Sequence, residues 1–262
     1  MTIADKVRRA KSDLDAVHNA GVEEGKAKGG YNEGFEDAYD SFWDAVQQNG
    51  NRTDYANAFV WWGCEDLNPK YKIVPTYGSN AARGMIYRNP NLKRLYSKDF
   101  DLSQLPNPSS ASVDYTFSLC SSLEVVEDIG LPAVKTLQYS FVNNAALKQV
   151  DVIRVAKETI VKDLLRSCPE LVTVNIEGTI GQTGINLQES KKLSRASIES
   201  IIRALSDEAS GQSITFSKAA VDEAFSGGIS ADDLVTPTEE GSNTVDWFNL
   251  YLRKGNWEII LV

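Results

Sequence analysis

An apolar pattern recurs in this sequence with a constant 24-residue period. Each copy has a Phe or Leu, then a Cys or Asn, then a Leu and a Val. The matching residues are Phe117, Cys120, Leu123 and Val126, then Phe141, Asn144, Leu147 and Val150, then Leu165, Cys168, Leu171 and Val174. A fixed period in the twenties is typical of stacked units that are each too small to bury their own apolar side chains. We therefore expect neighbouring units to share one core.

The spacing inside a copy indicates the shape of the unit. The Leu and the Val, followed two residues later by Val152 or Ile176, have the spacing of a short strand with inward-facing apolar side chains. We expect the Phe or Leu six residues before the Leu to pack against the opposite wall. The Cys or Asn lies between them, where it would fill the core or bond the backbone of the neighbouring unit. Amphipathic helices that repeat by chance are the alternative.

A degenerate fourth copy precedes these three. It consists of Ile86, Asn89, Leu92 and Leu95. Seven extra residues separate it from the first good copy, in the Pro/Ser-rich stretch 105–112. This composition predicts a surface loop.

The segment 115–126, Tyr-Thr-Phe-Ser-Leu-Cys-Ser-Ser-Leu-Glu-Val-Val, resembles the Ala-Phe-x-x-Cys-x-x-Leu-x-x-Ile core of BspA-type leucine-rich repeats. Segment 139–150 is a second match, and the third copy has Leu165 in place of Phe. The resemblance covers residues 85–177. It implies an α/β fold, a leucine-rich repeat solenoid of short parallel strands with helical or irregular connections, preceded by an N-terminal helical segment. Proteins of this class occur on bacterial cell surfaces and among phage structural proteins.

These patterns divide the chain into four expected parts. Residues 1–30 are expected to form an N-terminal helix, a coiled-coil-like stalk with a Gly-rich end. Residues 31–75 would form a helical, aromatic-rich module that caps the solenoid, and residues 76–180 the leucine-rich repeats. Residues 181–262 would form degenerate repeats and a C-terminal cap. In this last part we expect strands at 185–188, 213–216 and 257–262, helices at 197–207 and 219–225, and a final strand that completes the sheet.

The N-terminal segment has the period of a coiled-coil seam. Its apolar residues step by four and three: Ile3, Val7, Ala10, Leu14 and Val17. An isolated helix of about two heptads is marginal in water, so we expect it to pack against another copy of the chain or against its own body. The favoured outcome is a homo-oligomer. The glycines of 21–34 either continue the helix at a close contact or form a flexible linker.

Residues 31–75 concentrate aromatic side chains around two expected helices, 33–48 and 54–61. Segments 41–55 and 68–75 resemble a module that precedes leucine-rich repeats in prophage and phage tail-region proteins. We expect the aromatic cluster to seal the first repeat, because an uncovered terminal unit would expose its core. A ligand cage is the alternative.

The residue inventory gives little support to catalysis. The net charge of −9 and the pI of about 4.8 argue against binding nucleic acid or anionic lipid, and no apolar run is long enough for membrane insertion. His18 is the only histidine, so a Ser/His, Cys/His or multi-His site cannot form within one chain. We expect the carboxylates to be solvated. The sequence thus predicts no enzyme activity, no catalytic residue, no cofactor and no metal.

The three cysteines are expected to be free thiols. Cys120 and Cys168 occupy equivalent positions two units apart, which corresponds to roughly 10 Å for strands spaced about 4.8 Å apart. A disulfide requires Cα atoms within about 7 Å. Cys64 lies beside Trp61 and Trp62 and is expected to be a core residue.

The 24-residue register also aligns the side chains that point outward from the expected sheet. One row is Tyr96, Glu127, Asp151 and Asn175, and the other is Arg94, Val125, Gln149 and Thr173. A rigid scaffold would present these side chains as a fixed array, so they are candidates for a recognition face. A plain solvated sheet is the alternative.

Two functions fit these expectations. The first is a non-enzymatic phage structural protein of the tail, baseplate or fibre region, located in the virion. Its repeats would bind a protein or surface glycan of a host cell, or other virion proteins. The second is a bacterial cell-surface or secreted leucine-rich repeat adhesin. We expect the first, because the start of the sequence lacks the apolar run of a secretory signal.

Overall fold

The computed structural model describes residues 69, 71–76, 78–225 and 256–262. The expected seam, the two expected helices before residue 62, His18 and Cys64 lie outside the described residues. The described part is of the α/β class, with parallel strands and few helices. Its elements are β1 Arg94–Leu95, 3-10 helices η1 Leu102–Gln104 and η2 Pro108–Ser110, β2 Val125–Val126, β3 Gln149–Val155, β4 Thr173–Gly178, β5 Asn186–Leu187, α3 Arg195–Ala204, β6 Gln212–Phe216, α4 Lys218–Ala224 and β7 Trp257–Leu261.

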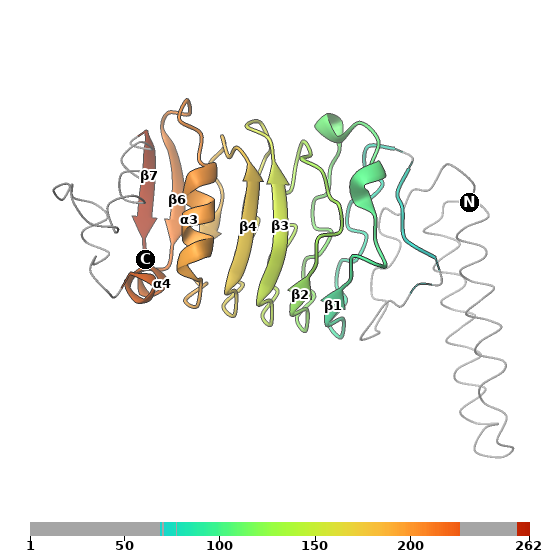
Figure 1. Cartoon of the computed structure of the whole chain (residues 1–262), viewed down its shortest axis with the longest axis horizontal. Helices are drawn as coiled ribbons and strands as arrows, with labels where there is room; N and C mark the ends of the chain where they lie inside the picture. Colours follow the sequence, from blue (N-terminus) through green and yellow to red (C-terminus); the bar gives the residue numbers. More distant parts are fainter. Residues whose placement is uncertain (1–68, 70, 77, 226–255) are drawn as a thin grey trace, which may run out of the picture.

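Strands β1 to β4 form one parallel sheet in the order β1-β2-β3-β4. Val126 pairs with Val150, and Val150 pairs with Val174, so the pairing follows the 24-residue period from strand to strand. Between β1 and β2 the step is longer, because Leu95 pairs with Val126 across the Pro/Ser-rich insertion. That insertion, residues 105–112, contains η2, and η1 lies directly before it. Figure 1 shows the strands side by side along the long axis of the molecule.

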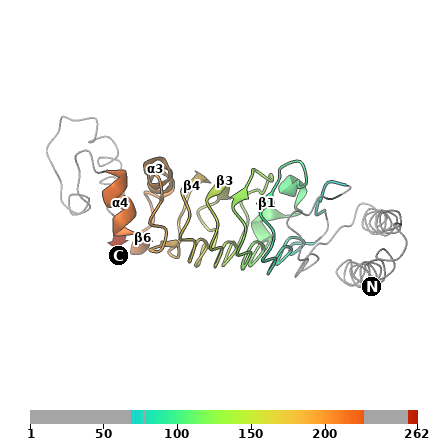
Figure 2. The ribbon, with the colours of Figure 1, turned by 90° about the horizontal axis from the view of Figure 1, so that it is seen from below.

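A second line of contacts joins the same units away from this sheet. Thr136 is bridged in parallel both to Ser112 and to Ile160, again at the 24-residue offset. Figure 2 shows the units from below as successive loops of similar outline. Each unit therefore contacts its neighbour at two walls, and the core lies between them.

The residues of the 24-residue pattern fill that core. Phe117, Leu123, Leu147 and Leu171 are fully buried, and the rings of Phe117 and Phe141 stack with centroids 5.1 Å apart. The remaining apolar residues of the pattern join the same cluster. Burying an aliphatic or aromatic side chain contributes about 1.5–3 kcal/mol. The 24-residue period therefore reflects the side chains that each unit contributes to the core it shares with its neighbour.

A buried polar ladder runs through the Cys and Asn positions. The Asn144 side chain accepts a hydrogen bond from the Cys120 backbone N–H at 2.9 Å and donates one to the Phe117 carbonyl at 2.8 Å. The Cys168 thiol donates to the Phe141 carbonyl of the preceding unit at 3.1 Å. Both cysteines are buried and free. Burial raises the pKa of each thiol to about 12.

The expectation that Val152 faces inward is wrong. Strand β3 is irregular between Val150 and Ile153, where Ile153 and not Val152 pairs with Ile176 of β4. Ile153 is buried and Val152 is only half-buried. The extra residue is a β-bulge, which shifts the inward-facing set by one position.

Beyond β4 the architecture changes. Helix α3 lies next to β4 in place of a fifth strand (Figure 1). The Ser197 and Ser200 hydroxyls accept hydrogen bonds from the backbone N–H groups of Val174 and Ile176, both at 2.9 Å. The edge of a sheet presents unpaired backbone groups, and here a helix covers them.

The second sheet has the order β5-β6-β7, and all its strands are parallel. Its strands lie close to the segments expected at 185–188, 213–216 and 257–262. The final strand was expected to complete the sheet of the repeats, but β7 pairs with β6 in this second sheet. The helix expected at 197–207 begins and ends earlier, at Arg195 and Ala204, with Ser194 as its N-cap. Within the described ranges, no helix is both long and apolar enough to cross a membrane.

Candidate functional site

The candidate site is the outward side of the β1–β4 sheet, which we call the recognition face. Arg94, Val125, Gln149 and Thr173 are Cα partners in successive strands, so one expected row is continuous across the sheet. Arg94 and Gln149 are exposed, whereas Val125 and Thr173 are half-buried. The row follows from the pairing register, since residues paired across parallel strands point to the same side.

One contact joins two members of the second row, and two others join this row to the first. Asn175 donates a hydrogen bond to the backbone carbonyl of Asp151 at 2.8 Å, and the Asp151 carboxylate accepts one from Gln149 at 2.6 Å. At the other end, the guanidinium of Arg94 lies 5.5 Å from the Tyr96 ring centroid. These contacts link the two rows and restrict the side-chain rotamers that a partner would meet.

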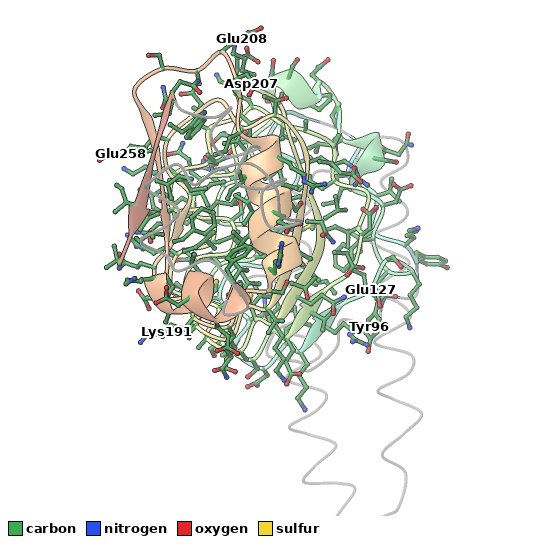
Figure 3. All side chains as sticks on the ribbon, turned by 60° about the vertical axis from the view of Figure 1, so that its left-hand side comes forward. Tyr96, Glu127, Lys191, Asp207, Glu208 and Glu258 are labelled. Carbon is green, nitrogen blue, oxygen red and sulfur yellow. The ribbon has the colours of Figure 1, made fainter. Side chains whose placement is uncertain are left out.

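Glu127 is held in place by the adjacent unit. Its carboxylate accepts hydrogen bonds from the backbone N–H and the hydroxyl of Ser97, at 2.8 and 2.9 Å. The Ser97 N–H is the main cause of a lowered pKa of Glu127, because it stabilises the ionised form. Figure 3 shows Glu127 and Tyr96 on the same side of the molecule.

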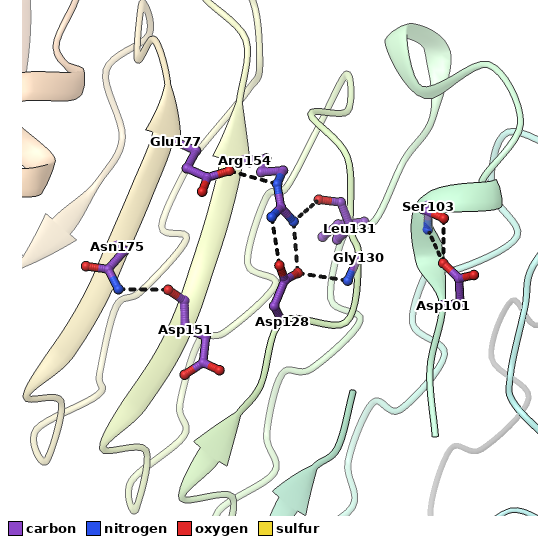
Figure 4. Close-up of polar contacts among 9 residues, drawn as sticks. All are labelled: Asp101, Ser103, Asp128, Gly130, Leu131, Asp151, Arg154, Asn175 and Glu177. Carbon is purple, nitrogen blue, oxygen red and sulfur yellow. Dashed lines mark hydrogen bonds and ion pairs between the residues drawn. The ribbon is translucent and has the colours of Figure 1, made fainter. Parts of the chain in front are cut away.

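A third row is centred on Arg154. Its guanidinium donates to both carboxylate oxygens of Asp128, at 2.9 and 2.7 Å, and to Glu177 at 2.9 Å (Figure 4). The hydrogen bond from Arg154 is the main reason that the pKa of Asp128 is lowered, and Asp128 in turn raises the pKa of Arg154. Arg154 of β3 thus links the residue Asp128, which follows β2, to Glu177 of β4. Its bidentate contact fixes the orientation of the Asp128 carboxylate.

A hollow of 440 Å³ adjoins the face where β4 meets α3. Ile176 and Gly178 line it from the strand, and Glu199, Ser200 and Arg203 line it from the helix. Gly178 has a φ of +99°, and a Cβ there would overlap the backbone oxygen of Val155. A residue without a side chain is therefore required at this end of the sheet.

The face offers hydrogen bonding and charge, and the lowered pKa values of Glu127 and Asp128 keep these two carboxylates ionised at neutral pH. The buried thiols of Cys120 and Cys168 are protonated there, since their pKa is about 12, and a thiol in that state is a poor nucleophile. Among the residues that the structure describes, no group of three or more His, Cys, Asp or Glu side chains could hold a metal ion.

Comparisons with protein-family models, with curated proteins and with solved structures find no match for this chain. The candidate site is therefore characterised from its own geometry.

Sequence reasoning found the first two rows and missed the third. Asp128 and Glu177 lie opposite Arg154 only because of the β3 bulge, which a strict 24-residue offset does not include. The sequence did offer one signal for this third row. Three successive units carry an acid, a base and an acid at Asp128, Arg154 and Glu177. The expected oligomerisation seam, from Ile3 to Val17, lies outside the described residues and stays a prediction.

Proposed function

We propose that this chain is a non-enzymatic binding protein built as a leucine-rich repeat solenoid of the BspA type, and that its recognition face contacts a protein or surface glycan of a host cell or another virion protein. The observation that carries the proposal is the set of outward side chains joined across successive strands. Hydrogen bonds from Arg154 to Asp128 and Glu177, and from Asn175 to Asp151, order polar groups before any partner arrives. Pre-ordered groups lose less conformational entropy on binding.

The solenoid part of the proposal is supported by the register. Pairing between β2, β3 and β4 follows the 24-residue period, and the parallel bridges at Thr136 advance by the same interval. Side chains of the repeated pattern are buried between the two walls. This is the arrangement in which units share a core with their neighbours only.

We place the protein in a phage tail region, with its N-terminal segment as the assembly element. The resemblance of segments 115–126, 41–55 and 68–75 to phage-associated proteins supports this location. A bacterial cell-surface adhesin is the alternative, because the same repeat class occurs there.

Fractionation of the source strain distinguishes the two locations. Phage particles would be induced, purified on a density gradient and probed with an antibody against residues 78–225. Comigration of the chain with tail proteins supports the virion location. Recovery with the cell envelope, in cells without induced phage, contradicts it and supports the adhesin.

The role of the face is tested by a triple variant, Gln149→Ala, Asp151→Ala and Asn175→Ala. A matched control, Lys218→Ala with Asp222→Ala on α4, removes charge at a distance from the face. We expect the triple variant to lose binding to host cells, measured by fluorescence of labelled protein, while the control retains it. Equal binding by wild type and triple variant would contradict the role of the face.

A further inference from the structure

A row of tyrosines lies outside the recognition face. Tyr115 and Tyr139 occupy the same position in successive units, and their rings stack with centroids 5.0 Å apart and planes 16° apart. Both have a left-handed backbone, with φ of 59° and 58°. That conformation costs an L-residue about 1–2 kcal/mol. Large rings are thus held at strained positions where a smaller residue would fit better.

The row is interrupted at Gly84. The Gly84 N–H donates to the Asp114 carbonyl at 3.0 Å, as the Tyr115 N–H donates to the Gln138 carbonyl at 3.1 Å, so the two residues are equivalent. Gly84 also has a φ of 60°. Because glycine has no ring, the stack ends at Tyr115, and Tyr87 stands there nearly edge-on, at 6.1 Å and 71°.

A hollow of 330 Å³ occupies this end of the row. Its lining consists of Arg83, Gly84, Tyr87, Asp114 and Tyr115. The volume is at the lower end of the range of about 300–1,000 Å³ for small-ligand pockets. The hollow thus combines two aromatic rings, a carboxylate and a guanidinium.

The carboxylate of Asp114 is fixed in position. One of its oxygens accepts hydrogen bonds from the Thr136 hydroxyl at 2.6 Å and the Gln138 N–H at 2.9 Å. Among the described residues no ion pair joins Asp114 to Arg83. The hollow therefore presents an acceptor and a donor of opposite charge to the same small space.

We propose that this hollow binds a neutral hexopyranose unit of a saccharide, whose ring stacks on Tyr115 beside Gly84 and Tyr87. A pyranose ring has an apolar C–H face, which suits the electron-rich face of an aromatic ring. Its hydroxyls both donate and accept, which suits Asp114 and Arg83. The two opposite charges give a charged ligand no net advantage. The site is separate from the recognition face, so its failure would leave the proposed function untouched.

The test titrates the full chain with the methyl glycosides of glucose, galactose, mannose and N-acetylglucosamine. Saturation-transfer NMR detects the contact, and chemical-shift titration gives the Kd. We expect at least one glycoside to bind, with the strongest transfer at the C–H protons of one ring face. Gly84→Tyr supplies the missing ring and fills the hollow, so binding should weaken about tenfold or more, equivalent to about 1.4 kcal/mol.

Further variants serve as checks and controls for Gly84→Tyr. Gly84→Tyr keeps a conformation that tyrosine already adopts at positions 115 and 139, and thermal melting monitored by circular dichroism checks its folding. Arg83→Gln changes an exposed side chain and should also weaken binding, which keeps the test valid if Gly84→Tyr does not fold. Tyr115→Ala should abolish binding, and Lys218→Ala, on α4, should leave it unchanged. Tyr96→Ala reports whether the sugar binds the recognition face instead.

Three results would overturn the proposal. The first is that wild type binds none of the four glycosides. The second is that binding is unchanged in both Gly84→Tyr and Arg83→Gln. The third is that Tyr96→Ala, and not Tyr115→Ala, abolishes binding, which would assign the sugar to the recognition face.

Discussion

Asn144 is the position at which one polar side chain does most to join two units. It is fully buried, and its amide satisfies the Cys120 N–H and the Phe117 carbonyl of the preceding unit. We expect Asn144→Leu to destabilise the protein severely, even though leucine has a similar volume. The reason is that both backbone groups would stay buried without a hydrogen-bond partner.

The magnitude follows from those two groups. An unsatisfied buried donor or acceptor costs about 1–3 kcal/mol, so the pair costs about 2–6 kcal/mol. The added apolar burial of leucine offsets part of this, by about 1.5–3 kcal/mol at most. We therefore expect a loss of about 2 kcal/mol. Asn144→Cys is the matched control, because the Cys168 and Cys120 thiols donate to the corresponding carbonyl of the preceding unit.

Urea unfolding followed by circular dichroism measures both variants. The free energy of unfolding, extrapolated linearly to water, should fall by about 2 kcal/mol for Asn144→Leu and by about 1 kcal/mol for Asn144→Cys. A loss below about 0.5 kcal/mol for Asn144→Leu would refute the reasoning. So would a larger loss for the cysteine variant than for the leucine variant.

Three further outcomes are expected. Arg154→Leu should return the pKa of Asp128 toward its ordinary value, seen by NMR titration of the carboxyl carbon. Because the folded-state pKa of Asp128 is lowered, the stability that Arg154 adds is present at neutral pH and should be lost as the pH falls through that pKa. Cys120 and Cys168 should resist iodoacetamide in the folded protein and react in urea, as read by mass spectrometry. Gly178→Ala should lower the free energy of unfolding by about 3 kcal/mol or more in urea, because its Cβ would overlap a backbone oxygen.

The 24-residue offset was enough to align the sheet, because it follows directly from which side chains enter the shared core. Phe117, Phe141 and Leu165 are all buried as the pattern requires. The first outward row, from Arg94 to Thr173, then follows from the alternation of side chains along a strand.

The β3 bulge could not be predicted from the period, since Val150 and Val174 keep the 24-residue offset although the strand pairing beyond them shifts by one residue. The consequence is local. Ile153 is buried in the core in place of Val152, and the Arg154 side chain contacts Asp128 and Glu177 on the outward side of the sheet. Such a contact depends on the three-dimensional path of one strand.

The tyrosine row shows a second feature that the repeat period alone does not predict. Tyr115 and Tyr139 visibly share the 24-residue spacing of the repeats, but their importance depends on a left-handed backbone and on the equivalence of Gly84. The insertion at 105–112 lies between Gly84 and Tyr115, so a fixed offset does not align them. Once the insertion is allowed for, Gly84 precedes Ile86 by two residues as Tyr115 precedes Phe117, and the hydrogen bonds between units confirm this match.

A pair of engineered cysteines tests most directly whether successive repeats align their outward side chains, on which the recognition face depends. Gln149 and Thr173 are Cα partners on strands about 4.8 Å apart, within the Cα range of roughly 4.4–6.8 Å for a disulfide. Gln149→Cys with Thr173→Cys should therefore oxidise to an intramolecular disulfide, identified by non-reducing peptide mapping. Gln149→Cys with Asn175→Cys, displaced by two residues to roughly 8 Å, should not. Preferential closure of the displaced pair would contradict the 24-residue alignment of the face.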